Sequence, residues 1–319
     1  MRHVGANGPV LPGKWMIGGA AASVAAVAVL MHVAGLQVDP AAPSLWPFYA
    51  CGGVATGLCV GFRKRTQPHH RVLRDLAEYL ALATLIAIVG ALASYPDAAV
   101  SHGFIDPTLA RADAALGFDW VAWYRVVAAH RWLQLGGRVA YDAIYWTPAA
   151  ILAFFAWTGR QDRARALLAS LAIAAAITLT LFAFLPAVGP FAYLWHGPAP
   201  YMPVSGLWQP LLIPPLREHH LHVVDVGALR GLVSIPSYHT AAGVLFIAAA
   251  WPERRLRWPV LAVNAAMLLA TPVEGTHYLV DMIAGAGVAG VALALVRGLH
   301  AGLRERRGAA PEQGRYATL

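Results

Sequence analysis

The sequence has few charged residues for its length. Only 13% of its 319 residues are Asp, Glu, Lys or Arg, whereas 58% are hydrophobic. A soluble domain carries roughly 25% charged residues, so this chain has too little polar surface for a water-soluble globule. Several apolar runs also approach or exceed the ~18 residues that a bilayer-spanning helix needs. The scarcity of charge therefore excludes a soluble domain and predicts a membrane protein.

Cysteine is also scarce, and no basic face with interleaved aromatic residues is present. The two cysteines, Cys51 and Cys59, fall within one apolar run. Residues eight apart on a helix lie ~12 Å apart, which is too far for a disulfide bond. The net charge of +8 comes mostly from short Lys and Arg clusters between apolar runs. This pattern argues against a nucleic-acid partner and favours the membrane bilayer.

The apolar runs predict an all-α fold, a polytopic membrane helical bundle of about eight transmembrane helices. The expected spans cover residues 15–35, 44–62, 76–95, 139–158, 166–186, 235–251, 258–273 and 278–297. We predict three parts. Residues 1–75 hold two accessory helices and a cytoplasmic loop, residues 76–297 form a six-helix core, and residues 298–319 are a disordered cytoplasmic tail.

The positions of Lys and Arg predict how the chain is oriented. Of the 24 basic residues, 18 fall at the N-terminus, in alternate loops or in the tail; the exceptions are Arg111, Arg125, Arg131, Arg138, Arg217 and Arg230. By the positive-inside rule, both termini are cytoplasmic in a multi-pass inner-membrane protein. The outer loops, 96–138 and 187–234, then face the periplasm. The second is rich in proline, which predicts a re-entrant or loop cap over a site.

The outer loop 96–138 carries a group of aromatic residues among scattered charges, namely Trp120, Trp123, Tyr124 and Trp132. We interpret them as anchors of an interfacial amphipathic helix. Asp142 stands at the edge of the next span, where it could contact substrate or extend to the interface.

Two segments place ionisable side chains at the outer ends of spans, where such groups are usually functional. The first runs from Ser234 to Thr240. Pro236 suits the first turn of a helix, and Ser234 is a plausible N-cap. The free N–H groups of that turn favour a phosphate. Ser237 can donate to that phosphate or cap the helix, and His239 can act as an acid or base.

The second segment runs from Glu274 to Asp281. His277 and Asp281 are four residues apart, so they are expected on one helix face. The carboxylate can orient the imidazole, which could then serve as a nucleophile, as in a catalytic triad. Glu274 could tune the site, but we interpret it as an exposed loop acid. Three glycines later in this span permit close helix packing; they are Gly285, Gly287 and Gly290.

These two segments resemble the type 2 phosphatidic acid phosphatase superfamily. Pro236-Ser237-Tyr238-His239 is similar to its Pro-Ser-Gly-His motif, and His277-x-x-x-Asp281 is similar to its His-x-x-x-Asp. The resemblance implies chemistry without a metal or another cofactor. In the family the second histidine attacks phosphorus and forms a phosphohistidine. Carried over, His277 is the nucleophile, Asp281 orients it, and His239 protonates the leaving group.

The sequence also departs from the family's pattern. It contains no Arg-Pro pair, and the expected Ser-Arg before His277 reads Ala270-Thr271. These missing cations hold a phosphomonoester that carries nearly two negative charges. Their absence favours a phosphodiester, which carries one. Arg230 and Arg217 are the candidate replacements in the outer loop.

The variant motif also resembles one branch of this family. The tyrosines Tyr238 and Tyr278 and the segment 185–190 are similar to the inositolphosphorylceramide synthase branch. That branch transfers a phospho-headgroup from a phospholipid donor to another acceptor, which suggests a sphingolipid or phosphoinositol lipid. Both tyrosines are then candidate substrate contacts.

Three functions remain open from the sequence. The favoured one is lipid phosphotransferase activity, and the alternative is hydrolysis of a lipid phosphate or polyprenyl diphosphate by the same residues with water as acceptor. A non-enzymatic lipid-binding or transport protein would make the triad a coincidence. A further cluster could bind a metal, although no second group of ligands accompanies it; it comprises His219, His220, His222 and Asp225.

Overall fold

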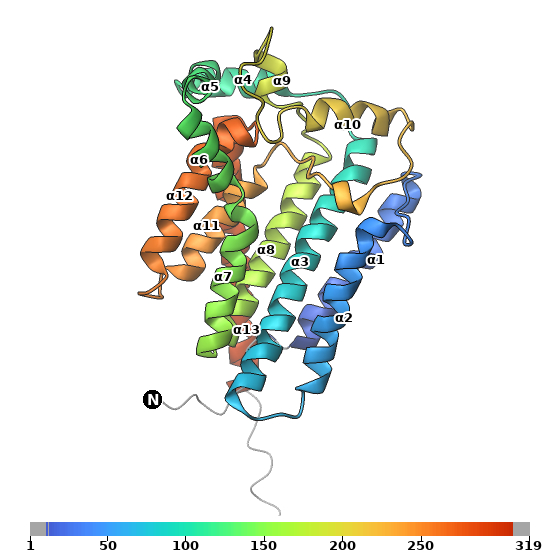
Figure 1. The fold of residues 1–319 in the computed structure, drawn as a ribbon, viewed down its shortest axis with the longest axis vertical. Helices are drawn as coiled ribbons and strands as arrows, with labels where there is room; N and C mark the ends of the chain where they lie inside the picture. Colours follow the sequence, from blue (N-terminus) through green and yellow to red (C-terminus); the bar gives the residue numbers. More distant parts are fainter. Residues whose placement is uncertain (1–10, 12, 309–319) are drawn as a thin grey trace, which may run out of the picture.

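The protein is a helical bundle capped at one end, as its computed structural model shows (Figure 1). The structure describes residues 11 and 13–308, and within them every regular element is helical, apart from one isolated β-bridge between Gln37 and Val223. The long helices run side by side, and the short helices gather at the opposite end from the last turns of α13. We call this end the cap end.

The N-terminal part packs its helices against one long helix. α1 covers Gly13–Val33, α2 covers Trp46–Gly61 and α3 covers Pro68–Val100. α3 contacts both of them and also the later helices α7, α8 and α10. α2 has no buried residue, so its apolar surface faces outward, as a lipid-exposed helix requires.

Six further helices complete the bundle. They are α6 (Arg131–Tyr141), α7 (Ala143–Thr158), α8 (Gln161–Phe182), α11 (Tyr238–Ala250), α12 (Arg257–Glu274) and α13 (Leu279–Gly308). Many of the buried residues at which these helices pack are alanines, such as Ala174, Ala242 and Ala289. Small side chains let helix backbones approach closely, which is how membrane helices gain packing energy.

The cap end is built by the two predicted outer loops. They contain four short α-helices and a 3₁₀ turn: α4 (Asp106–Ala115), α5 (Trp120–Ala129), α9 (Pro190–Leu194), α10 (Trp208–Arg217) and η2 (Val226–Ala228). A second 3₁₀ turn, η1 (Pro43–Leu45), lies between α1 and α2 and contacts η2. α4 of the first loop contacts α9 of the second, so the two loops meet at the same end of the bundle.

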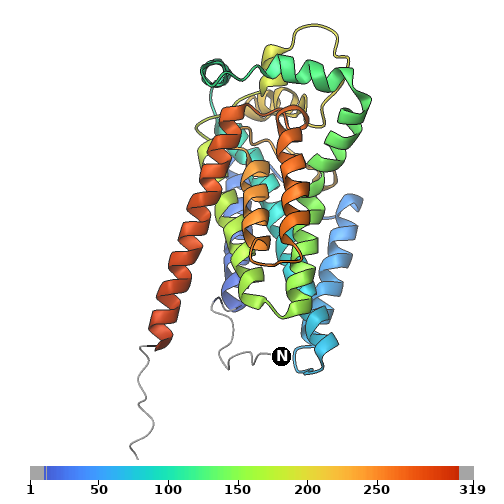
Figure 2. The same ribbon diagram turned by 90° about the vertical axis from the view of Figure 1, so that its left-hand side faces the viewer.

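The number of predicted membrane spans is only partly supported. All eight predicted ranges coincide with helices, but four described helices are long and apolar enough to cross a membrane: α1, α3, α8 and α13. A fifth span follows if α6 and α7, which are bent by 46°, count as one. α2 and α11 have 16 and 13 residues, fewer than the ~20 that a span needs. Figure 2 shows that the α11–α12 hairpin ends well before the far end of α13.

Two further predictions need correction. The tail was predicted to begin at residue 298, but α13 continues to Gly308; residues 309–319 lie outside the described part of the chain. Trp120 and Tyr124 were predicted as interface anchors, yet both are buried. The indole of Trp120 donates to the carbonyl of Pro272, and the hydroxyl of Tyr124 donates to the carbonyl of Tyr201. Trp132 is exposed, as an anchor would be.

Candidate active site

The first motif forms the start of α11, in a different way from the prediction. The helix begins at Tyr238, and Ser237 is its N-cap, since its Oγ accepts a hydrogen bond from the N–H of Thr240 at 3.3 Å. Pro236 therefore lies before the helix. Ser234 is not a cap: its hydroxyl exchanges two hydrogen bonds with the backbone of Ala187, at 3.0 and 3.1 Å. Ser234 thus ties this motif to the loop after α8.

The second motif lies at the start of α13. The helix begins at Leu279, so His277 stands just before it and not on its face. Thr276 adopts a left-handed backbone conformation (φ 49°), which turns the chain at this point. Nδ1 of His277 lies 3.4 Å from Oδ2 of Asp281, and the same oxygen accepts the N–H of Tyr278 at 3.0 Å. The carboxylate can therefore fix the tautomer of His277 and leave Nε2 free to react.

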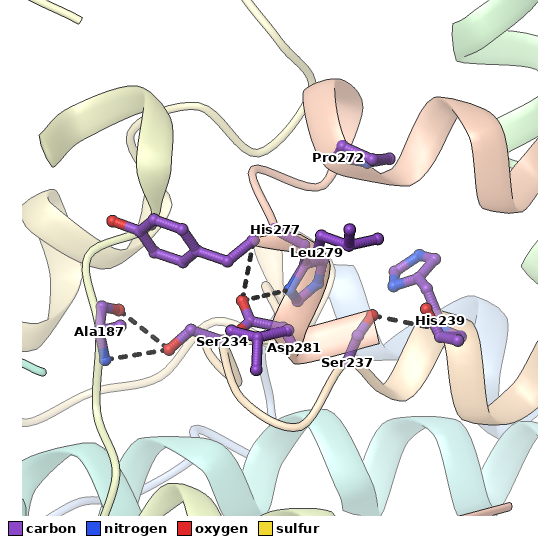
Figure 3. A network of polar contacts seen from close by, with 12 residues as sticks. Ala187, Ser234, Ser237, His239, Pro272, His277, Leu279 and Asp281 are labelled. Carbon is purple, nitrogen blue, oxygen red and sulfur yellow. Dashed lines mark hydrogen bonds and ion pairs between the residues drawn. The ribbon is translucent and has the colours of Figure 1, made fainter. Parts of the chain in front are cut away.

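The two histidines line one cavity of about 350 Å³. In Figure 3 their imidazoles lie next to each other, with Asp281 on the side of His277 away from His239. The ring of Tyr141 stacks on His239 with centroids 4.2 Å apart, and its hydroxyl lies 3.4 Å from Nδ1. Nε2 of His239 is buried and has no hydrogen-bond partner in the described part of the chain. Two segments far apart in sequence thus present one imidazole each to the same space.

The close approach of the two motifs depends on one glycine. The backbone N–H of Ser237 donates to the carbonyl of Asp281 at 3.0 Å. One turn further along α13, a Cβ built on Gly285 would lie nearer to the carbonyl oxygen of Ser237 than the 3.0 Å that real Cβ atoms keep. The starts of α11 and α13 therefore touch backbone to backbone.

Two aspartates outside both histidine motifs hold the loops around this site. Both carboxylate oxygens of Asp113 accept backbone N–H groups at the start of α13, from Leu279 at 2.8 Å and Val280 at 2.9 Å. Asp106, seven residues earlier on α4, accepts the N–H groups of Val188 and Gly189 and the hydroxyl of Tyr278. Their spacing on one helix face was the signal available in the sequence.

Removal of the Asp113 carboxylate should weaken the start of α13. We expect Asp113→Ala to lower the free energy of unfolding by about 1–2 kcal/mol, as loss of a helix cap does, and to lower activity because His277 precedes this turn. Asp119→Ala is the matched control, since Asp119 caps α5 through the N–H of Ala122 and is exposed. Thermal unfolding and turnover in detergent would check both. Equal activity losses in the two variants would contradict this role.

Glu274 is not the exposed acid that we predicted. It is only 1% exposed, and its carboxylate accepts the hydroxyl of Tyr201 at 2.6 Å and the N–H of Val204 at 3.2 Å. Its carbonyl accepts two bonds from Ser205. Burial raises the pKa of Tyr201 to about 12, so this hydroxyl stays protonated and donates to Glu274 at ordinary pH. Glu274 thus fastens the proline-rich loop over the cavity.

The other predicted contacts divide into two groups. Arg230, Tyr238 and Asp142 line the cavity with the histidines. Arg217 does not: it bonds to Ser101 and Gly103 and lies over the ring of Phe104. Tyr278 is buried beside the site but directs its hydroxyl to Asp106. The roles of the residues that meet at the cavity stay predictions.

The histidine cluster of the outer loop has other partners. His220 pairs with Glu218, and Nδ1 of His222 lies 3.3 Å from the carbonyl of Gly35. Asp225 accepts the hydroxyl of Ser44 at 2.7 Å. Across residues 11 and 13–308, no three His, Cys, Asp or Glu side chains form a group that could hold a metal ion.

Comparison with known proteins assigns the sequence to a family. The sequence profile of the PAP2 superfamily matches residues 107–295, which is more than half of the chain and includes both histidines and Asp281. No curated protein and no solved structure matched the chain in the corresponding searches. The protein is a membrane protein of the PAP2 superfamily, and lipid phosphatase or phosphotransferase activity is the general function of that family.

Proposed function

We propose that this protein is a lipid phosphotransferase that moves a phospho-headgroup from one lipid to another through a phosphohistidine. One observation carries the proposal: His239 and His277 line one cavity, and Oδ2 of Asp281 lies 3.4 Å from Nδ1 of His277. A nucleophile, its orienting carboxylate and a separate acid then share one space, which is what a two-step displacement needs.

In the first step, Nε2 of His277 attacks phosphorus. A P–N bond forms while the P–O bond to the diacylglycerol oxygen breaks. His239 gives that oxygen the proton from Nε2, the nitrogen that has no other partner among the described residues. The imidazolium character that develops on His277 is stabilised by Asp281 through Nδ1–H.

The second step reverses these roles. The hydroxyl of the acceptor lipid gives its proton to Nε2 of His239 and attacks phosphorus. The P–N bond breaks, which returns His277 to its starting state, and the headgroup now belongs to the new lipid. With water in place of the lipid alcohol, the same residues would act as a phosphatase.

The cavity walls are largely apolar and include one cation. Small or apolar residues of α3, α8 and α11 line much of the cavity, including Ala87, Ala175 and Phe246, and leave room for hydrocarbon. Of the described residues that line it, Arg230 alone is Lys or Arg. The carboxylate of Asp142 lines the same cavity, so the lining has little net positive charge to hold the nearly two negative charges of a phosphomonoester, which supports a diester donor.

Arg230 should therefore contribute to donor binding. Arg230→Met is expected to raise KM for a phosphodiester lipid about tenfold, since a charged hydrogen bond contributes about 1.5–3 kcal/mol in a buried site and less at this exposed one. Arg111→Met is the matched control, because Arg111 is an exposed cap-end residue outside the cavity. Steady-state kinetics would measure both; equal KM values for Arg230→Met and wild type would contradict the role.

We further propose the membrane arrangement that the charge pattern favours. In it the cap end faces the periplasm, both termini are cytoplasmic, and α2, α11 and α12 also lie at membrane depth as members of an eight-helix bundle. Accessibility labelling of single cysteines in the Cys51→Ala, Cys59→Ala background would test it. Labelling of the α4–α5 connection from the cytoplasm would oppose this orientation.

Transfer and hydrolysis can be separated with the purified full-length protein. It would be reconstituted with a phospholipid labelled in its headgroup, with and without a hydroxylated lipid acceptor. Label in a new lipid supports the transferase. Release of only water-soluble label favours the phosphatase, and lipid binding without turnover favours the non-enzymatic alternative.

A further inference from the structure

A buried tyrosine at the bend between α6 and α7 contacts the first histidine of the site. Tyr141 is the last residue of α6, and the two helices meet there at 46°. Tyr141 is 5% exposed, and its ring stacks on the imidazole of His239 with 4.2 Å between the centroids and 11° between the planes. Its hydroxyl, 3.4 Å from Nδ1, is the sole hydrogen-bond partner of that imidazole among the residues that the structure describes.

The segment before the second histidine also lies against this ring. A Cβ built on Gly275 would lie 3.0 Å from Cε2 of Tyr141 and 2.9 Å from Cδ2 of His277. The absence of a side chain at Gly275 therefore lets the tyrosine ring approach the chain two residues before His277. Packed against both motifs, the ring keeps its hydroxyl in one place, as a group that orients another side chain must.

The two imidazoles have chemically different partners at the same nitrogen. Nδ1 of His277 faces the carboxylate of Asp281, whereas Nδ1 of His239 faces the neutral hydroxyl of Tyr141. A carboxylate stabilises the positive charge that develops on an attacking imidazole. A hydroxyl can accept Nδ1–H without adding a negative charge that would hold the proton on the ring, which suits a group that must release a proton from Nε2.

We infer that Tyr141 is the positioning residue of the acid: its hydroxyl accepts Nδ1–H of His239 and so assigns proton transfer to Nε2. This inference rests on the proposed function. In the first step Nε2–H gives its proton to the leaving oxygen, while Nδ1–H stays bonded to Tyr141. The neutral imidazole that remains then has its lone pair on Nε2, where it takes the proton of the acceptor alcohol in the second step.

The test varies the leaving group and keeps the phosphoenzyme the same. Two phosphodiesters, labelled at phosphorus, share one octyl group; the other ester is octyl in the first and p-nitrophenyl in the second. Both transfer octyl phosphate to His277, but only octanol needs a proton to leave. With the full-length protein in lipid nanodiscs, we expect Tyr141→Phe to slow labelling by dioctyl phosphate about tenfold, as loss of one hydrogen bond to a charged ring does, and by the p-nitrophenyl ester less than about twofold.

Two further variants separate positioning from folding. Tyr124→Phe is the matched control, because Tyr124 is also buried, stacks on Trp120 and donates its hydroxyl to the carbonyl of Tyr201, outside the cavity. Any change in this variant should be equal for the two esters. Tyr141→Leu removes the ring stack as well, so its loss with dioctyl phosphate should reach about 10²-fold. Thermal unfolding would show that each variant is folded.

The outcomes distinguish this inference from the proposed function. Equal losses on both esters in Tyr141→Phe and Tyr141→Leu, or no loss on either, overturn the positioning role and leave the function standing. Wild-type protein that is labelled by the p-nitrophenyl ester alone would lack an effective acid, which also overturns the role. Wild-type protein that forms no phosphoenzyme with either ester or with a labelled phospholipid overturns the proposed function itself.

Discussion

Replacement of His277 by Ala is expected to reduce turnover by at least about 10⁴-fold and to abolish the covalent intermediate. The reason is that no other described side chain at the cavity combines a free imidazole nitrogen with an orienting carboxylate, as His277 does with Asp281 at 3.4 Å. Loss of the nucleophile of a triad lowers kcat by this amount or more, because no remaining group can attack phosphorus in its place. Acid-labile, alkali-stable label on the wild-type protein, absent from the variant, would measure it.

His239→Ala should fail in a different way, and this contrast makes the prediction sharp. Loss of an acid that protonates the leaving group costs about 10²–10⁴-fold. A p-nitrophenyl phosphodiester releases an anion that needs no proton, so it should still label His277 in this variant. His277→Ala should stay unlabelled with the same compound. Label that persists in His277→Ala would show that another residue is the nucleophile.

The two histidine motifs could be recognised in the sequence because each is short and local. His239 and His277–Asp281 carry their chemistry in residue types whose spacing is visible in the chain. Their shared cavity was an expectation that required the fold, and the structure brings them together. The local geometry of His277 and Asp281 could not be predicted from their spacing. Thr276 turns the chain before α13 begins, so His277 reaches Asp281 from a bend and not from the same helix face.

The supporting residues were missed because their partners are distant in sequence. Asp113 bonds to Leu279 across more than 160 residues, and Glu274 bonds to Tyr201. From sequence alone, a carboxylate in a loop is interpreted as a solvated charge, because its backbone partners are not known. The span count is supported only in part for a related reason: apolar periodicity locates α11, but it does not show the length of the helix, which has 13 residues.

Glycines in the last helix illustrate the same limit. Gly285, Gly287 and Gly290 were predicted alike as packing residues, yet only Gly285 meets another backbone. At Gly287 and Gly290 no described atom lies within 4 Å of the added Cβ. The spacing of small residues predicts a contact, but the partner helix determines which of them makes it.

Gly285→Ala is therefore expected to damage the site, and Gly287→Ala is not. The added methyl group of Gly285→Ala would press on the carbonyl of Ser237 and approach Thr240, and neither is the end of a flexible side chain. Such overpacking costs about 1–3 kcal/mol of stability. Separation of α11 from α13 would also displace His239 from His277, and a shift of ~1 Å in a reacting pair lowers the rate about 10²-fold.

Gly287→Ala is the matched control because it makes the same chemical change two residues away in open space. Its activity should equal that of wild type, and its stability should stay equal or rise slightly, since Ala favours a helix over Gly. Turnover and thermal unfolding of both variants in the same detergent would check the pair. Full activity in Gly285→Ala would mean that the backbone contact between the two motifs does not set the distance between the imidazoles.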